Sequence, residues 1–190
     1  SLWIWALALL PLAGPIAYLI VEVLPGLGRS RAARRAASAV RNTIDPDRNL
    51  RQYSGEVRIS GNVDSRRRLA EELANKGKYP EAIETYRSAL SGLYEHDPHL
   101  LLGLAQAQFG SSDFRGARET LDRLIRENPD FKSADGHLLY ARALEGEGNL
   151  DQAVEEYRTL SGYYPGAEAT VRYGQLLKRR GEAEAARKVF

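Results

Sequence analysis

Four stretches of the sequence share one pattern: LAEELANKGKYPEAIETYRSAL (69–90), LAQAQFGSSDFRGARETLDRLI (104–125), YARALEGEGNLDQAVEEYRTLS (140–161) and YGQLLKRRGEAEAARKVF (173–190). Each stretch holds an alanine at the same place, and successive alanines are separated by 35, 36 and 33 residues: Ala82, Ala117, Ala153 and Ala186. Self-similarity at such a period is typical of solenoids, in which stacked units bury a shared core. The pattern therefore predicts a solenoid of helical hairpins over residues 63–190.

Each unit divides into two predicted helices and a tight turn. The first helix carries a large apolar residue followed by a small one, which lets the paired helix approach closely: Leu69-Ala70, Leu104-Ala105, Tyr140-Ala141 and Tyr173-Gly174. The turn holds Gly or Ser, at Gly77, Ser112, Gly148 and Gly181. A residue two positions later begins the second helix: Tyr79, Phe114, Leu150 and Ala183. Prolines follow several of these helices, since proline cannot continue one. We expect units at about 63–97, 98–133, 134–166 and 167–190.

These in-register copies resemble the tetratricopeptide repeat family over about two thirds of the chain. The resemblance implies an all-α fold, a right-handed α-solenoid of about four hairpins, whose first helices line a concave groove for peptides or helices of partner proteins. Carried over by position, the lining is Arg67, Glu71, Leu102, Gln106, Phe109, Leu138, Arg142, Glu145, Val171, Gln175 and Lys178. Its apolar centre and charged ends suit an extended or helical segment with a few apolar anchors.

Two points qualify this groove. An exposed apolar patch has either a partner or a cover, so Leu102, Phe109 and Leu138 could instead lie beneath a neighbouring segment. A short helix predicted from about Pro46 to Ile59 is one such segment. Some family members bind acidic chaperone C-termini through a clamp that includes an asparagine, and here that position is Glu71. A carboxylate there would repel another carboxylate, which argues against this subclass.

The N-terminal residues 1–26 are predicted to form a transmembrane anchor. From Leu2 to Leu24 the only charged residue is Glu22, and a helix of this length would span about 34 Å, enough for a bilayer core. A cleaved signal peptide and a buried core helix are the alternatives; no basic residue precedes the apolar run, which argues against cleavage. Three residues near its middle can kink the helix, pack against another membrane helix, or form a re-entrant turn: Pro11, Gly14 and Pro15.

The same segment resembles the short membrane segment at the N-terminus of phospholipase D and cardiolipin synthase proteins. The residues that carry the resemblance are Trp5, Pro11, Gly14 and Tyr18. It implies an anchor, and a further membrane helix before Ser1. The H-x-K-x4-D motif of that family is absent, because none of the three histidines has a lysine two residues on. The resemblance therefore does not extend to lipase chemistry.

Residues 27–62 are predicted to hold a basic juxtamembrane helix and the linker helix. The arginines expected on the membrane surface are Arg29, Arg31, Arg34 and Arg35, and each would gain about 1 kcal/mol near anionic lipids. Their excess on this side of the anchor places the repeats in the cytoplasm, at the cell inner (plasma) membrane. Nucleic-acid binding is the other interpretation of an arginine cluster, but no aromatic residue interleaves it.

The composition gives little support to catalysis. The chain of 190 residues has no cysteine, which excludes a disulfide framework and a thiolate site, and its net charge is +2. His96, Asp97 and His99 lie together, but no third metal ligand is in view. There is no glycine-rich phosphate loop of the required form. We expect no enzyme activity, no cofactor, no metal and no small-molecule substrate.

The sequence thus predicts a membrane-anchored adaptor or assembly protein that binds a protein partner through its solenoid groove. The alternative is a permanent accessory subunit of an integral membrane complex, with the prolines of the anchor packed against its helices. A lipid-active relative of phospholipase D is a third hypothesis, against which the missing motif argues.

Overall fold

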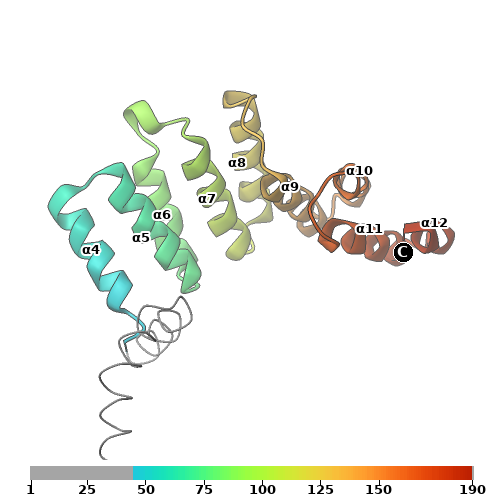
Figure 1. Ribbon diagram of the computed structural model, residues 1–190, viewed down its shortest axis with the longest axis horizontal. Helices are drawn as coiled ribbons and strands as arrows, with labels where there is room; N and C mark the ends of the chain where they lie inside the picture. Colours follow the sequence, from blue (N-terminus) through green and yellow to red (C-terminus); the bar gives the residue numbers. More distant parts are fainter. Residues whose placement is uncertain (1–44, 190) are drawn as a thin grey trace, which may run out of the picture. The chain divides into compact units, whose positions relative to one another are not determined.

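In the computed structural model, residues 45–189 are described, and they form helices and connections only. All four repeat units lie within one compact unit, residues 50–190. In chain order the elements are α4 (Arg48–Ser60), α5 (Val63–Asn75), α6 (Tyr79–Ala89), the 3-10 turn η2 (Gly92–Tyr94), α7 (Pro98–Gly110), α8 (Phe114–Glu127), α9 (Ala134–Glu147), α10 (Leu150–Ser161), α11 (Glu168–Arg179) and α12 (Ala183–Val189) (Figure 1).

The helices from α5 onward form four hairpins stacked in chain order. Each helix packs against the next along the chain, and α7 also contacts α5 and α9, the first helices of the units on either side. The predicted all-α solenoid of helical hairpins is therefore confirmed. In Figure 1, α5–α8 lie side by side, and the axes of α9–α12 turn away from their direction after the connection at 128–133.

The core lies between the two helices of each hairpin and between successive hairpins. The repeated alanines Ala82, Ala117 and Ala153 are completely buried, and Ala186 nearly so. Tyr86 and Tyr157, from the second helices of the first and third units, are the large side chains of the two main clusters. An alanine at the helix crossing allows the close approach that buries these rings, and burying one aromatic side chain stabilises the fold by about 1.5–3 kcal/mol.

The turns inside the hairpins adopt the left-handed conformation. Their φ angles are +73° at Gly77, +65° at Ser112, +84° at Gly148 and +82° at Gly181. Glycine reaches this region without a steric cost, whereas a side chain such as that of Ser112 is strained there. The sequence therefore predicted the positions of all four turns. In the second unit the left-handed position is occupied by Ser112, a residue type that does not favour this conformation.

The predicted linker helix corresponds to α4, which begins two residues later than expected. Leu50 packs against the core cluster of the first unit, and Glu56 pairs with Arg68 at 3.7 Å. Ile59 is almost fully exposed. The contacts of α4 with the first unit do not make it a cover for Leu102, which packs against a different cluster.

Several predictions fall on residues 1–44, outside the described part of the chain. These are the anchor at 1–26, the packing residues Pro11, Gly14 and Pro15, and the arginines Arg29, Arg31, Arg34 and Arg35. Within residues 45–189, no helix combines the length and the apolar character needed to cross a bilayer.

Candidate peptide-binding groove

The first helices of units one and two, α5 and α7, frame a cavity of about 620 Å³. Four of the residues predicted for the groove line it together: Arg67, Glu71, Leu102 and Gln106. Arg67 Nη1 donates a hydrogen bond to Glu71 Oε1 at 2.6 Å, and this bond raises the pKa of the Arg67 guanidinium. The wall thus presents an ion pair beside the half-buried Leu102 and the exposed amide of Gln106.

Tyr86 forms the floor of this cavity because α7 has a glycine above it. A Cβ placed on Gly103 would lie 2.5 Å from the Tyr86 hydroxyl oxygen, so any side chain there would displace the ring. Burial, with the negative charge of Glu71, raises the pKa of Tyr86 to about 12. The hydroxyl therefore keeps its proton to a higher pH than an ordinary tyrosine, and it lies at the base of the groove as a group that can donate and accept hydrogen bonds.

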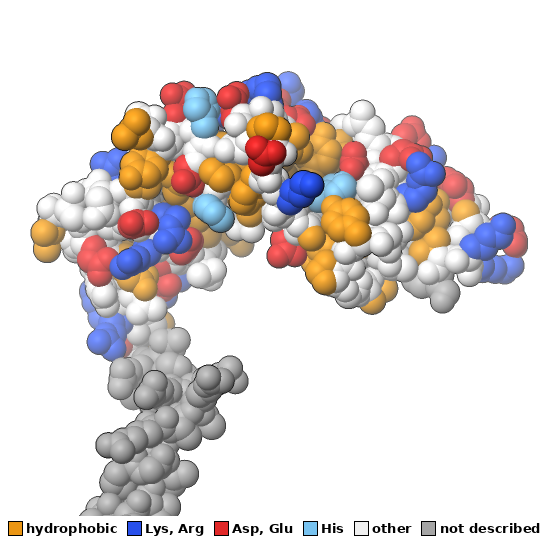
Figure 2. Space-filling model, turned by 45° about the horizontal axis from the view of Figure 1, so that its top comes forward, with side chains coloured by type: hydrophobic (Ala, Val, Ile, Leu, Met, Phe, Trp, Pro, Cys, Tyr) orange, Lys and Arg blue, Asp and Glu red, His pale blue; other side chains and the backbone are white. Residues whose placement is uncertain are grey.

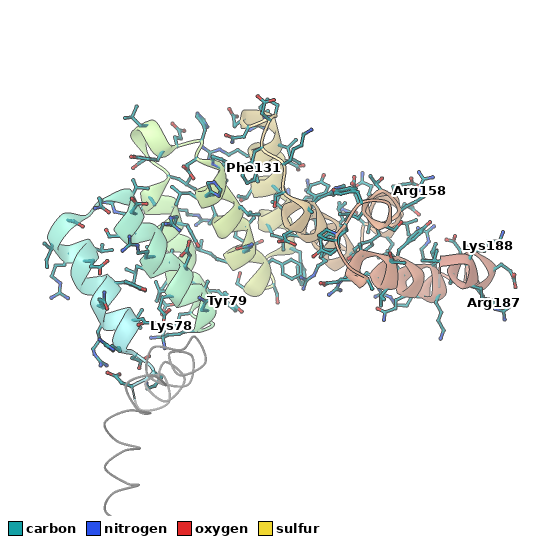
Figure 3. The ribbon with its side chains drawn as sticks, in the orientation of Figure 1. Lys78, Tyr79, Phe131, Arg158, Arg187 and Lys188 are labelled. Carbon is teal, nitrogen blue, oxygen red and sulfur yellow. The ribbon has the colours of Figure 1, made fainter. Side chains whose placement is uncertain are left out.

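The connection between the first two units closes one side of the cavity. Tyr94, Asp97 and His99 line it there, and Asp97 also caps α7 by accepting from the backbone N–H groups of His99 and Leu100. The His99 ring packs edge-on against Phe131, with centroids 5.4 Å apart. Figure 3 shows Phe131 projecting from the α8–α9 connection toward α7. His99 thus both lines the cavity and packs against Phe131.

A second cavity, of about 290 Å³, lies where α7, α9 and α11 meet the start of α8. Its lining includes three further predicted residues, Phe109, Arg142 and Glu145. The Arg142 guanidinium lies over the Phe109 ring, 4.6 Å from its centroid, a cation–π arrangement. Glu145 accepts a hydrogen bond from the Tyr157 hydroxyl at 2.7 Å and pairs with Arg179.

The remaining predicted residues do not join these cavities. Leu138 is only 4% exposed and belongs to the core cluster with Tyr157 and Leu160. Its assignment to the groove was wrong, because it is buried in a core cluster that also contains Ala169 and Leu176 of the fourth unit. Exposed residues of α11 that lie outside both cavities are Val171, Gln175 and Lys178.

Sequence reasoning missed a third cavity, of about 470 Å³, between α8, the 128–133 connection, α9 and α10. Its wall is mainly apolar. His137, in this wall, forms hydrogen bonds with Glu156, Nε2 to Oε2 at 2.5 Å, and with the Tyr163 hydroxyl. At the equivalent place in the preceding unit stands Leu101, which is fully buried. A histidine where the previous unit has a core leucine was the signal that could have revealed this cavity.

No cluster of metal ligands exists among residues 45–189. His96 lies 3.8 Å from Glu127, whereas His99 packs against Phe131, so the two histidines face different partners. Figure 2 shows hydrophobic side chains interrupted by charged ones across the viewed face, a mixture suited to polar and apolar contacts with a protein segment.

Stacked helical hairpins, each in contact with its neighbours along the chain, define an α-solenoid. Residues 73–142 and residues 138–190 each match a model of the tetratricopeptide repeat. Residues 73–190 therefore belong to the tetratricopeptide repeat family, and most of α5 precedes the first match. Both matches lie after residue 72, so the resemblance of the N-terminal segment to phospholipase D proteins stays a prediction.

Solved structures share this fold. The crystal structure of MamA is 23% identical with a TM-score of 0.67, over 79% of this chain and 87% of that one. MamA 41-end from Desulfovibrio magneticus RS-1 is 17% identical with a TM-score of 0.69, over 83% and 88%. YrrB, described as a TPR protein with an unusual peptide-binding site, is 18% identical with a TM-score of 0.61, over 80% and 78%. No curated protein sequence matches this chain.

Proposed function

We propose that this protein is an adaptor that binds a segment of a partner protein in the groove along α5, α7 and α9. The observation that carries the proposal is the cavity of about 620 Å³ that brings Arg67, Glu71, Leu102 and Gln106 together. It combines an apolar contact with an ion pair and an amide, which is how grooves bind side chains and backbone of an extended or helical segment. Cavities of this size are in the range of ligand sites.

Site-specific photocrosslinking tests the groove. A benzophenone amino acid at Gln106, which is exposed in the cavity wall, is expected to capture a discrete partner protein in cells. The matched control carries the same probe at Gln152, which is exposed on α10, outside the groove. Replacing Leu102 by Asp in the Gln106 probe strain should abolish the capture. The proposal fails if both positions capture the same species, or if Gln106 captures only lipid or the protein itself.

The membrane location is part of the same proposal. It rests on the apolar run at 2–24 and on the arginines Arg29, Arg31, Arg34 and Arg35 that follow it. An anchor of this kind would hold the groove, and any partner in it, at the cytoplasmic face of the inner membrane. A reporter enzyme fused after Phe190 should be active in the cytoplasm; activity confined to the periplasm would refute this topology.

A permanent subunit is the second candidate. The prolines Pro11 and Pro15 in the apolar run favour it, since a proline in a membrane helix would free backbone carbonyls that in lipid need protein or water as partners. A subunit should stay stoichiometric with its complex through purification in detergent, whereas an adaptor should dissociate.

A further inference from the structure

The groove ends in a cavity whose charge is unbalanced. Its lining holds Arg142, Arg172 and Arg179 but only one acid, Glu145. Two of the arginines already have partners: Arg172 pairs with Glu168 at 2.9 Å, and Arg179 pairs with Glu145. Arg142 makes no ion pair with any residue of the described part of the chain. The cavity therefore retains a positive charge with which no acidic residue of positions 45–189 forms an ion pair.

Aromatic side chains fix the position of Arg142. Its guanidinium carbon lies over the Phe109 ring, 4.6 Å from the centroid, and Phe109 is supported edge-on by Phe114, with centroids 5.2 Å apart. Phe114 can lie there because Gly146 has no side chain: a Cβ would lie 2.5 Å from the Phe114 Cγ. A guanidinium held on a ring has already lost much of its rotamer freedom, so a ligand needs to order less when it binds.

We propose, resting on the groove function above, that this cavity binds the side-chain carboxylate of an Asp or Glu in the bound partner segment. A carboxylate matches the planar fork of Arg142 and can accept two hydrogen bonds from it. Glu145 does not compete, because the Tyr157 hydroxyl and Arg179 already occupy its oxygens. A Lys or Arg of the partner would face three guanidinium groups and be repelled.

The helix geometry adds a spacing rule. Leu102 lines the larger cavity and Phe109 the smaller one, and both lie on α7. Seven residues of helix correspond to about 10 Å along its axis. An extended segment advances about 3.3 Å per residue. In the partner segment, the acidic residue should therefore lie at least about three residues from the residue that binds beside Leu102.

The site differs from an acid-binding clamp on the first unit. At that end the cavity is lined by Asp64, Glu71 and Asp97 against Arg67, so the charge there is negative. The groove is therefore polarised, negative beside α5 and positive beside α9 and α11. We expect the partner segment to bind in one direction, with its acidic residue at the end of α7.

Selection from a random dodecapeptide phage library tests the proposal, with the full-length protein in lipid nanodiscs as bait. The enriched peptides should carry Asp or Glu at least three residues from an apolar residue. A synthetic enriched peptide should bind Arg142→Gln about tenfold more weakly than wild type, the loss expected for one charge-assisted hydrogen-bonded contact. Arg142→Lys should recover only part of the affinity, because it restores the charge without the planar fork.

A double-mutant cycle separates a direct contact from a structural effect. The peptide with its acid replaced by the amide should bind wild type as weakly as the acid peptide binds Arg142→Gln, and combining both changes should cost nothing further. Arg115→Gln is the matched control, because Arg115 is an exposed arginine of α8 outside both cavities, paired with Glu119. It should leave affinity unchanged.

The outcomes distinguish the two proposals. A consensus without acidic residues, or equal binding to wild type and Arg142→Gln, overturns the carboxylate site while leaving the groove. Gln106→Trp, which fills the larger cavity from an exposed position, should abolish all peptide binding. Binding that survives Gln106→Trp, or a library that yields no enriched peptide, counts against the groove itself and with it the carboxylate site.

Discussion

The junctions between successive units are built in two different ways. Where the second unit meets the first, Gly110 faces Tyr79, and a Cβ on that glycine would lie 2.3 Å from the ring. Figure 3 shows Tyr79 at the start of α6. Where the third unit meets the second, Gly146 faces Phe114 in the same way. The equivalent position of the fourth unit is Arg179, and the residue that begins α10 is Leu150 rather than an aromatic.

The difference shows that one position of the repeat can either allow aromatic packing or supply a polar side chain. At the first two junctions, a missing side chain lets an aromatic ring bury itself against the next helix. At the third, the long side chain of Arg179 reaches Glu145, which also accepts from Tyr157. Packing is thus replaced by a polar network, and the network lies beside the groove. The presence of Arg179 in place of a glycine also adds a positive charge to the end of the groove beside α9 and α11.

The largest effect is expected at a packing junction. Gly146→Ala should lower the free energy of unfolding by about 1–3 kcal/mol, because the new methyl overlaps the root of the Phe114 ring. Gly55→Ala is the matched control: a Cβ there meets nothing within 4 Å, so it should stabilise α4 by up to about 1 kcal/mol through helix propensity. Thermal unfolding followed by circular dichroism measures both. A change of the same sign at the two glycines would contradict the packing account.

A substitution at the polar junction between the third and fourth units should lower stability less. Tyr157→Phe removes the hydrogen bond to Glu145 and should cost about 1 kcal/mol at pH 7. Burial, and then that hydrogen bond, raise the pKa of Tyr157 well above its usual range. An unfolded tyrosine ionises near pH 10 while the buried one keeps its proton, so the wild-type protein loses stability as the pH rises above about 10. The phenylalanine variant lacks this loss.

Urea unfolding at pH 8 and at pH 11 therefore measures the same bond in two ways. The difference in the free energy of unfolding between wild type and Tyr157→Phe should be smaller at the higher pH. The other tyrosines with raised pKa values, Tyr86, Tyr140, Tyr163 and Tyr164, contribute equally to the stability of both proteins, so their effects cancel in the comparison. A difference that stays constant, or becomes larger, would show that the stabilising contribution of Tyr157 does not depend on the proton of its hydroxyl.

The repeat pattern predicted the helices and turns more fully than it predicted the residues of the groove and its cavities. The turns, the buried alanines and the residues that begin the second helices follow from local rules, since each depends on one position in one unit. Leu138 was misplaced because it lies in a core cluster that includes residues of α10 and α11, which the pattern of α9 alone does not contain. The roles of His137 and Arg179 were missed for a related reason: each is an exception to its repeat position, and its partners come from other helices.

The smallest effect is expected at the turn of the second unit, which departs from the other three. Ser112 has φ +65° where the equivalent residues are glycines, and it lies two residues before Phe114, so it fixes the start of the helix that carries this ring. A side chain in this region costs about 1 kcal/mol or more. Ser112→Gly relieves that strain but lets the unfolded chain gain entropy, so the net gain should be about 0.5 kcal/mol.

The reverse change at a matched turn completes the test. Gly148→Ser introduces the same strain at φ +84° without relieving any, and should lower the unfolding temperature by more than Ser112→Gly raises it. If Ser112→Gly destabilises the protein instead, the serine hydroxyl must contribute to the turn more than the strain costs. The exception in the second unit would then be a stabilising feature and not a tolerated one, and the aromatic junction at Phe114 would depend on the turn that precedes it.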